Sequence, residues 1–407
     1  MKTRAIKAGF AVSALALAVS PAIAATDLRI DGFANFAAGQ MLSDTDEGSM
    51  YGYDEDVSFA PETQYGIQFR GDLKEDLSVT AQIVGRGSED YDAKVTWAYV
   101  SYAVNDEWTI RAGRSRVPYF MYSDFLDVAY AYHWLRPPAA VYTLGFENQD
   151  GITAEYVTDI GPLNSRLTLM AGRSDSTVES GGDLLDVSIR NQMGGAWSLT
   201  YDWFTARIAY FESRLAIPNE GTAALADGII GYDAALALFV PGYTAGTLDS
   251  VADDVQFDED KASFAGFGVS ADVNNIIAVA EYTMVRSDET PLEDRDAWYV
   301  SAGYRIQKFT VFGTFEKWNF NAQTDTVEEF ERSAPITGIA PLDAGRAGIL
   351  DGLQQAFVGT KDADTVGVGL RYDFHPSAAF KVEYNQMDNQ TDDTKPKSLA
   401  VAVQLTF

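Results

Sequence analysis

The chain has 407 residues, of which 46% are hydrophobic and 13% aromatic, and its formal net charge is −29. Abundant aromatic residues argue against an intrinsically disordered chain, and so acidic a surface repels phosphate groups, which argues against a nucleic-acid partner. The chain has no cysteine and two histidines, His133 and His375. Disulfides, thiolate metal sites and a cysteine nucleophile are therefore excluded, and we expect neither a cofactor nor a bound metal.

The first 24 residues have the pattern of a secretory signal peptide. Three basic residues within the first seven precede an apolar run at 8–20, and residues 22–24 (Ala-Ile-Ala) have the small-x-small form of a cleavage site. A membrane anchor is the alternative, but the apolar run is short for a spanning helix, which needs about 20 residues. We therefore predict export, with residues 25–407 forming one mature domain.

Beyond residue 24, the recurring feature is a segment of about ten residues in which apolar and polar positions alternate. In residues 398–407 the odd positions carry large apolar side chains and the even positions small or polar ones. This pattern is typical of a strand with one face in an apolar medium and the other near water. Sixteen such segments occur, at residues 27–39, 61–72, 77–87, 93–104, 107–117, 151–159, 164–174, 189–201, 204–214, 261–272, 276–287, 294–305, 308–319, 363–374, 378–388 and 397–407.

The connections between these segments alternate between short turns and long loops, and no later apolar stretch is long and uninterrupted enough for a spanning helix. Lipid cannot satisfy free backbone N–H and C=O groups, so a sheet that spans a membrane has to close on itself. Sixteen strands close into a barrel wide enough for a water-filled channel. We therefore predict an all-β fold, an up-and-down antiparallel transmembrane barrel with short inner turns and long outer loops.

Aromatic residues gather near the ends of the segments. Trp and Tyr favour the membrane interface, where one end of the ring is apolar and the other wet. The residues expected in such girdles are Trp97, Tyr99, Trp108, Trp197, Tyr201, Trp203, Trp298, Tyr304 and Phe374.

With these features the chain resembles the porins of the Gram-negative outer membrane. The resemblance rests on the leader, the sixteen amphipathic segments, the alternating loop lengths, the acidic balance and the closing sequence VAVQLTF at 401–407. The terminal Phe407 resembles the signal that the outer-membrane assembly machinery reads in this family. The resemblance implies an integral outer-membrane channel for passive diffusion of small hydrophilic solutes and ions, in contact with lipid and lipopolysaccharide, and assembly as a homotrimer.

The resemblance also implies that the third outer loop folds into the lumen and narrows it. Here this loop is 118–150, whose aromatic residues make it too apolar to hang in water, and it would present Asp124 and Asp127 to the pore. An outer cap or a subunit contact is the alternative. The loop lacks the PEFGG-like stretch of general porins, so their constriction residues do not transfer directly.

Alternation along the strands selects the arginines that face inward, because an arginine facing lipid at the bilayer midplane costs about 2–4 kcal/mol. Arg70, Arg86 and Arg111 are the candidates for the pore constriction, opposite Asp124 and Asp127. Such opposed charges would create a transverse field that orients dipolar solutes and ranks ions by sign. Four further arginines are candidates for lumen or lipopolysaccharide contacts: Arg114, Arg166, Arg173 and Arg207.

Other functions remain as alternatives to passive diffusion. A substrate-specific channel would use lumen charges and aromatic side chains as a weak site, and an adhesin or receptor would use the long loops at 215–260 and 320–362. An enzyme of the barrel type would need a serine near a histidine base, and neither histidine has a nucleophile motif. A soluble secreted β-protein would not require detergent. Ion conductance in planar bilayers separates a channel from the other classes.

Overall fold

The computed structural model describes residues 27–44, 48–180, 183–256, 258–287, 290–291, 293–357 and 361–407. The predicted signal peptide, residues 1–24, lies outside the described residues. Sixteen strands make up the sheet: β1 (Asp27–Met41), β2 (Gln64–Lys74), β3 (Leu77–Arg86), β4 (Ala93–Ala103), β5 (Trp108–Arg116), β6 (Asn148–Ile160), β7 (Leu163–Ser180), β8 (Asp183–Tyr201), β9 (Phe204–Ala216), β10 (Asp260–Val273), β11 (Ile276–Ser287), β12 (Asp294–Ile306), β13 (Phe309–Asn321), β14 (Lys361–His375), β15 (Ala378–Asn389) and β16 (Lys397–Thr406).

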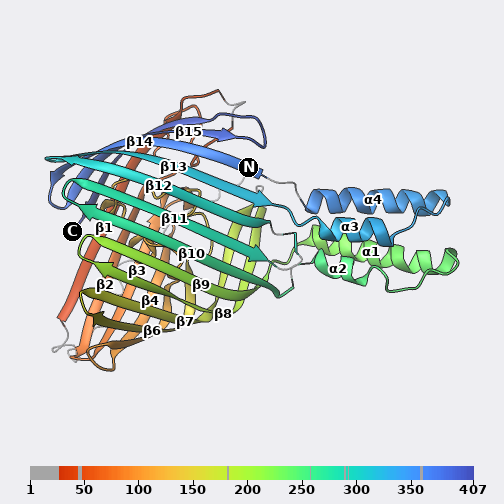
Figure 1. Cartoon of the computed structure of the whole chain (residues 1–407), viewed down its shortest axis with the longest axis horizontal. Helices are drawn as coiled ribbons and strands as arrows, with labels where there is room; N and C mark the ends of the chain where they lie inside the picture. Colours follow the sequence, from red (N-terminus) through yellow and green to blue (C-terminus); the bar gives the residue numbers. More distant parts are fainter. Residues whose placement is uncertain are drawn as a thin grey trace, which may run out of the picture.

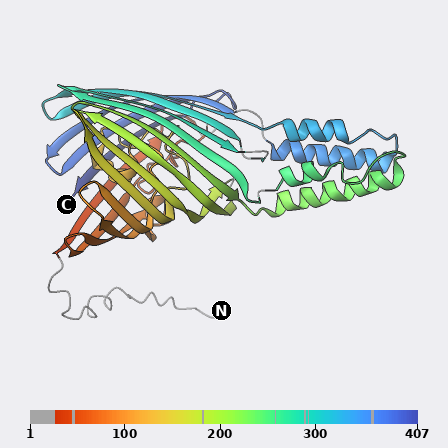
Figure 2. The same ribbon diagram turned by 60° about the horizontal axis from the view of Figure 1, so that its bottom comes forward.

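Each strand pairs antiparallel with its neighbours in sequence, and β1 pairs with β16, so the sheet closes into a barrel (Figures 1 and 2). The sixteen segments expected from the sequence all correspond to strands, and the predicted closed up-and-down barrel is confirmed. Short turns lie at one end of the barrel and the long loops at the other. We call these the short-turn end and the long-loop end.

The last residue of the chain closes the barrel against the first strand. The backbone N–H of Gly32 donates to the carbonyl oxygen of Phe407 over 2.7 Å, and the N–H of Phe407 donates to the carbonyl oxygen of Gly32 over 2.9 Å. A Cβ at position 32 would lie 2.3 Å from the Phe407 ring, so this ring covers the glycine. Position 32 therefore has room for no larger residue while the terminal ring stays in place.

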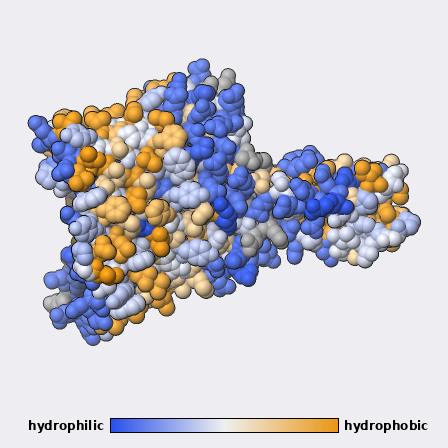
Figure 3. Space-filling view, viewed as in Figure 1, coloured by the Kyte–Doolittle hydropathy of each residue, from blue (hydrophilic) through white to orange (hydrophobic). Residues whose placement is uncertain are grey.

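The two faces of the strands differ as the alternation predicts. On β3, Val79 faces the surroundings of the barrel and is 36% exposed, whereas the neighbouring Ser78 and Thr80 face the lumen and are buried. On β14, Val366 and Val368 are about half exposed in the same way. Hydrophobic residues cover much of the barrel wall in the view of Figure 3, and hydrophilic residues dominate toward the long-loop end. The outer wall is therefore matched to lipid.

Two of the long loops carry helices, which the sequence analysis did not predict. These are α1 (Glu220–Phe239) and α2 (Asp249–Asp254) between β9 and β10, and α3 (Asp325–Ser333) and α4 (Ala340–Ala356) between β13 and β14. They pack together as an extension that projects from the long-loop end (Figures 1 and 2). Its core contains fully buried side chains from all four helices, among them Ile229, Leu236, Val251, Phe330 and Leu353.

Helix α1 is long and apolar enough, by length and composition, to cross a membrane. In the extension, however, it packs against α2 and α4, and its Asp233 is buried. The Asp233 carboxylate accepts hydrogen bonds from the Tyr243 hydroxyl and from the backbone N–H groups of Gly246 and Leu248, over 2.6–3.1 Å. These bonds hold the turn that leads from α1 to α2, so α1 is the central helix of a small bundle.

Candidate pore constriction

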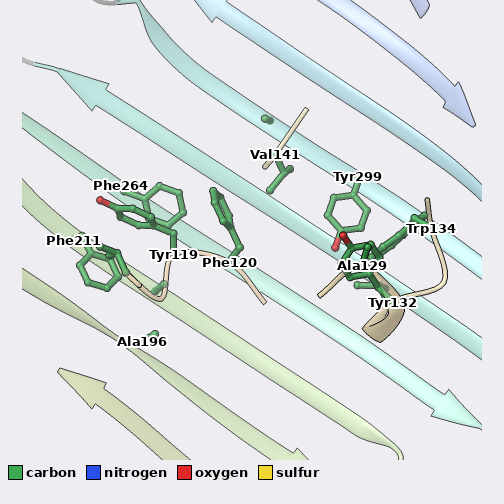
Figure 4. Packing of buried hydrophobic residues seen from close by; sticks show 14 of the residues in the cluster. Tyr119, Phe120, Ala129, Tyr132, Trp134, Val141, Ala196, Phe211, Phe264 and Tyr299 are labelled. Atoms are coloured by element: carbon green, nitrogen blue, oxygen red, sulfur yellow. The ribbon is translucent and has the colours of Figure 1, made fainter. Parts of the chain in front are cut away.

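The loop between β5 and β6, residues 117–147, folds into the barrel and packs against its inner wall. It contains two short 3₁₀ turns, η4 (Ser123–Phe125) and η5 (Ala129–Ala131). Figure 4 shows its aromatic side chains against the strands: the Tyr119 ring lies between Phe211 and Phe264, with ring centroids 5.1 and 4.7 Å away. Further along, the Trp134 ring meets Tyr299 edge-on at 5.6 Å. The burial of these rings explains why so apolar a loop packs against the barrel wall and is not exposed to solvent.

Polar side chains on the same wall bind the loop backbone. The Lys381 ammonium, fully buried on β15, donates to the carbonyl oxygens of Ala129, Tyr132 and Trp134 over 2.5–2.8 Å. The Trp134 indole N–H donates to the Ser301 hydroxyl over 2.9 Å. The polar inner face of β12 to β15 is therefore engaged by the loop.

Asp127, one of the two predicted loop acids, is buried in an ion-pair cluster. Its carboxylate lies 2.6 Å from the Arg86 guanidinium and 2.5 Å from that of Arg116, which in turn lies 3.3 Å from Glu147. Burial opposes ionisation, but the positive charges of Arg116 and Arg86 outweigh it and lower the pKa of Asp127. Asp127 therefore fastens the loop to β3 and β5. We call Arg86, Arg116, Asp127 and Glu147 the loop latch.

Arg116 was missed by the sequence analysis because strict alternation places it on the opposite face from Arg111. Both side chains reach the lumen, since Arg111 pairs with Glu155 and Arg116 with Asp127. Gly113 lies between them at a φ of 131°, a conformation that side chains rarely adopt. A Cβ at position 113 would also lie 2.3 Å from the carbonyl oxygen of Ala98. The glycine thus marks where regular alternation in β5 ends.

Beside the loop lies a cavity of about 240 Å³, which we call the constriction chamber. Arg111 and Arg166 face it from β5 and β7, and both pair with Glu155 of β6, over 3.4 and 3.0 Å. Asp124, which is exposed, lines the chamber from the loop. The structure therefore brings Arg111, Arg166 and Asp124 together. Glu155 was not predicted from the sequence, where only arginines were assigned to the lumen, although alternation along β6 places it on the inward face as well.

Trp97 and Tyr99 also line the constriction chamber. They lie opposite Gln82 and Thr80 of β3, whose side chains face the lumen. The expectation that these two rings belong to the aromatic girdle is therefore wrong. Their position near a strand end suggested that they belong to the girdle. The alternation of side chains along β4, however, places both rings on the inward face.

Arg70 is not brought together with the other candidates. It lies near the short-turn end of β2 and pairs with Asp72 over 3.1 Å. Arg207 is half-buried on β9, where its guanidinium donates to the carbonyl oxygen of Pro118 over 2.6 Å and so supports the start of the loop.

A larger cavity of about 520 Å³ lies at the long-loop end and is lined in part by Arg86, Lys94, Arg114 and Glu147. Arg114 donates two hydrogen bonds of 2.8 Å to Asp150, and Arg173 stands opposite Asp150 in the β6–β7 pairing. We call this space the outer cavity. It adjoins the constriction chamber at the loop latch, because Glu147 lines the outer cavity and its partner Arg116 lines the chamber.

Comparisons with known proteins agree with this architecture. The family model for Gram-negative porins matches residues 11–403, whereas no curated protein matches the chain. The outer-membrane channel DcaP of Acinetobacter baumannii aligns with a TM-score of 0.58 at 13% identity, covering 94% of this chain and 98% of its own. Salmonella typhi OmpF aligns at 0.55 and 14%, covering 93% and 97%. The anion-selective porin of Comamonas acidovorans aligns at 0.53 and 10%, covering 94% and 100%.

The family match spans nearly the whole chain, and the structural likeness extends over the complete barrel. The chain belongs to the Gram-negative porin family and is an integral outer-membrane channel for the passive diffusion of small hydrophilic solutes.

Proposed function

We propose that solutes cross this porin along the wall formed by β3 to β7, through the outer cavity and then the constriction chamber. The carrying observation is the asymmetry of the lumen: most of loop 117–147 packs against the inner face of β9 to β15, whereas residues of β3 to β7, together with the loop, line the outer cavity and the constriction chamber. The loop latch stands where the two cavities meet. Its burial keeps the loop from closing the path or withdrawing from it.

The charges in the constriction chamber favour a transverse electric field as the means by which the channel distinguishes anions, cations and dipolar solutes. Arg111 and Arg166 project from the strands, with side chains 30% and 45% exposed, and the exposed Asp124 lines the chamber from the loop. Anions pass on the arginine side and cations on the aspartate side, and a dipolar solute is oriented between them. Arg86 and Asp127 neutralise each other, so they affect the shape of the path by holding the loop and contribute little to the field. Arg70 lies at the short-turn end, away from the constriction.

Reversal potentials in planar bilayers under a KCl gradient test this assignment. Asp124→Asn should shift the preference toward anions, and Arg111→Gln or Arg166→Gln should shift it toward cations, because each removes one side of the field. Arg332→Gln, in helix α3 of the extension, where the exposed arginine pairs with Glu328 away from both cavities, is the matched control and should have a smaller effect. Unchanged reversal potentials in Asp124→Asn and both chamber arginine variants would remove these residues from the constriction.

Assembly as a homotrimer is part of the same proposal. It is supported by membership of the porin family and by OmpT of Vibrio cholerae, which was solved in a trimer form and aligns with a TM-score of 0.52 at 11% identity. Arg114 and Arg173, at the long-loop end, are placed to contact lipopolysaccharide, and Phe407 carries the assembly signal. The mass of the detergent-solubilised protein by light scattering tests the trimer, and a monomer mass would refute it.

A further inference from the structure

We propose that the constriction chamber is a weak binding site for small aromatic carboxylates, solutes with one flat ring and one carboxylate group. This inference rests on the proposed solute path, since it names the solute class that the path would favour. Three independent features of the chamber carry it: an aromatic surface, guanidinium groups with unused donors, and a buried donor without a partner.

The aromatic surface is formed by Trp97 and Tyr99, which occupy successive inward positions of β4. Their ring centroids are 6.4 Å apart, at an interplanar angle of 42°. Both side chains are only half-buried, and neither belongs to the aromatic cluster that packs the loop against the wall. They thus leave apolar ring surface toward a water-filled space, which a flat apolar solute would cover.

The anionic group of the solute would meet Arg111 and Arg166. Glu155 is shared between these two guanidiniums, which together offer ten N–H donors to its two oxygen atoms. The contact from Arg111 to Glu155 is long, at 3.4 Å, and the Arg111 guanidinium lies 5.8 Å from the centroid of the Tyr99 ring. A carboxylate held by these arginines therefore has its ring beside Tyr99.

A third feature is the indole nitrogen of Trp97. It is shielded from solvent and, among the residues that the structure describes, its N–H finds no acceptor. A buried donor without a partner is unfavourable, by about 1–3 kcal/mol. A rotation of the half-buried indole ring would bring this N–H to the chamber, where an oxygen atom of a bound solute would supply the missing acceptor, so the residue that offers ring surface also offers a polar contact.

The volume of the chamber limits the size of the solute that it can bind. Sites for drug-sized ligands measure about 300–1,000 Å³, whereas this chamber measures about 240 Å³, which suits a single ring. An aliphatic carboxylate such as acetate would pair with the arginines but leave the rings uncovered. An uncharged aromatic such as benzamide would cover the rings without pairing with the arginines. The combination of both interactions distinguishes an aromatic carboxylate.

The test uses the full-length porin in planar bilayers with benzoate, acetate and benzamide as probes in KCl. Benzoate should interrupt the single-channel current in a concentration-dependent manner, and acetate and benzamide should do so at least tenfold less effectively. Trp97→Leu and Arg166→Gln should each weaken the benzoate block about tenfold. Trp97→Phe, which keeps a ring and removes the N–H donor, should have an intermediate effect. Heat-modifiable migration on gels establishes that each variant barrel is folded.

Tyr102→Leu is the matched control. Tyr102 lies on the same strand but faces outward and is 45% exposed, so its benzoate block should equal that of the unaltered protein. Equal block by benzoate and acetate, or a benzoate block unaffected by Trp97→Leu, overturns the inference. If the reversal potential responds to Asp124→Asn while benzoate has no effect, the aromatic site fails and the proposed path stands. Absence of any ion conductance overturns both.

Discussion

The loop latch allows a quantitative prediction for Asp127→Asn. The side chains of Arg116 and Asp127 are 4% and 7% exposed, so removing the negative charge leaves a buried guanidinium short of one partner. Breaking a buried ion pair from one side costs about 3–5 kcal/mol. Arg116 keeps Glu147 at 3.3 Å, and Arg86 is 24% exposed and regains some solvation. Both effects reduce the cost, to about 2–3 kcal/mol.

This energy acts on the packing of loop 117–147, because the barrel ladder does not depend on the latch. Since about 1.4 kcal/mol corresponds to a factor of ten, the population of the released conformation of the loop should rise by about 30- to 140-fold. Hydrogen exchange of peptides within 117–147 measures that population, and single-channel current noise should rise with it. Melting of the barrel should change little.

Asp124→Asn is the matched control for this experiment, since Asp124 lies three residues earlier in the same loop and is exposed. It should leave hydrogen exchange of the loop unchanged while it alters ion preference. The reasoning is refuted if exchange within 117–147 is equally slow in the unaltered protein and in Asp127→Asn. It is also refuted if both variants accelerate exchange to the same extent.

Three further predictions follow from buried groups. Lys381→Met leaves three loop carbonyl groups without their donor, so loop exchange should accelerate by at least tenfold, and unchanged exchange would contradict the assigned role. Burial, reinforced by the nearby charge of Lys381, lowers the pKa of His133 from its usual 6.5 to about 3, so the released loop binds more protons than the packed loop. The packing of loop 117–147 is therefore most stable above about pH 6.5 and loses stability as the pH falls toward 3. Single-channel current noise should rise over that pH range, and it should rise less in His133→Gln. Asp233→Ala removes the acceptor of three hydrogen bonds in the extension, at a cost of about 2 kcal/mol, so proteolysis near residues 240–248 should accelerate while barrel melting stays the same.

Much of the barrel could be predicted from local pattern because each strand lies between lipid and water. In residues 397–406, for example, the alternation of large apolar and small or polar side chains determines both the strand and its orientation. The helical extension was not predicted, although Asn219, whose side-chain oxygen accepts from the N–H groups of Gly221 and Thr222, is a recognisable helix start. Its helices bury their apolar residues against one another, and the partners come from two separate loops.

The sequence by itself determined which strands form, which face of most strands meets lipid, and which family the chain resembles. Only the tertiary structure decided that Asp127 is buried and Asp124 exposed, because the partner Arg86 is 41 positions away in the chain. The same holds for Lys381, which binds loop carbonyls about 250 positions earlier. Periodicity reports the environment of a strand, whereas the constriction depends on contacts between distant segments that no local pattern records.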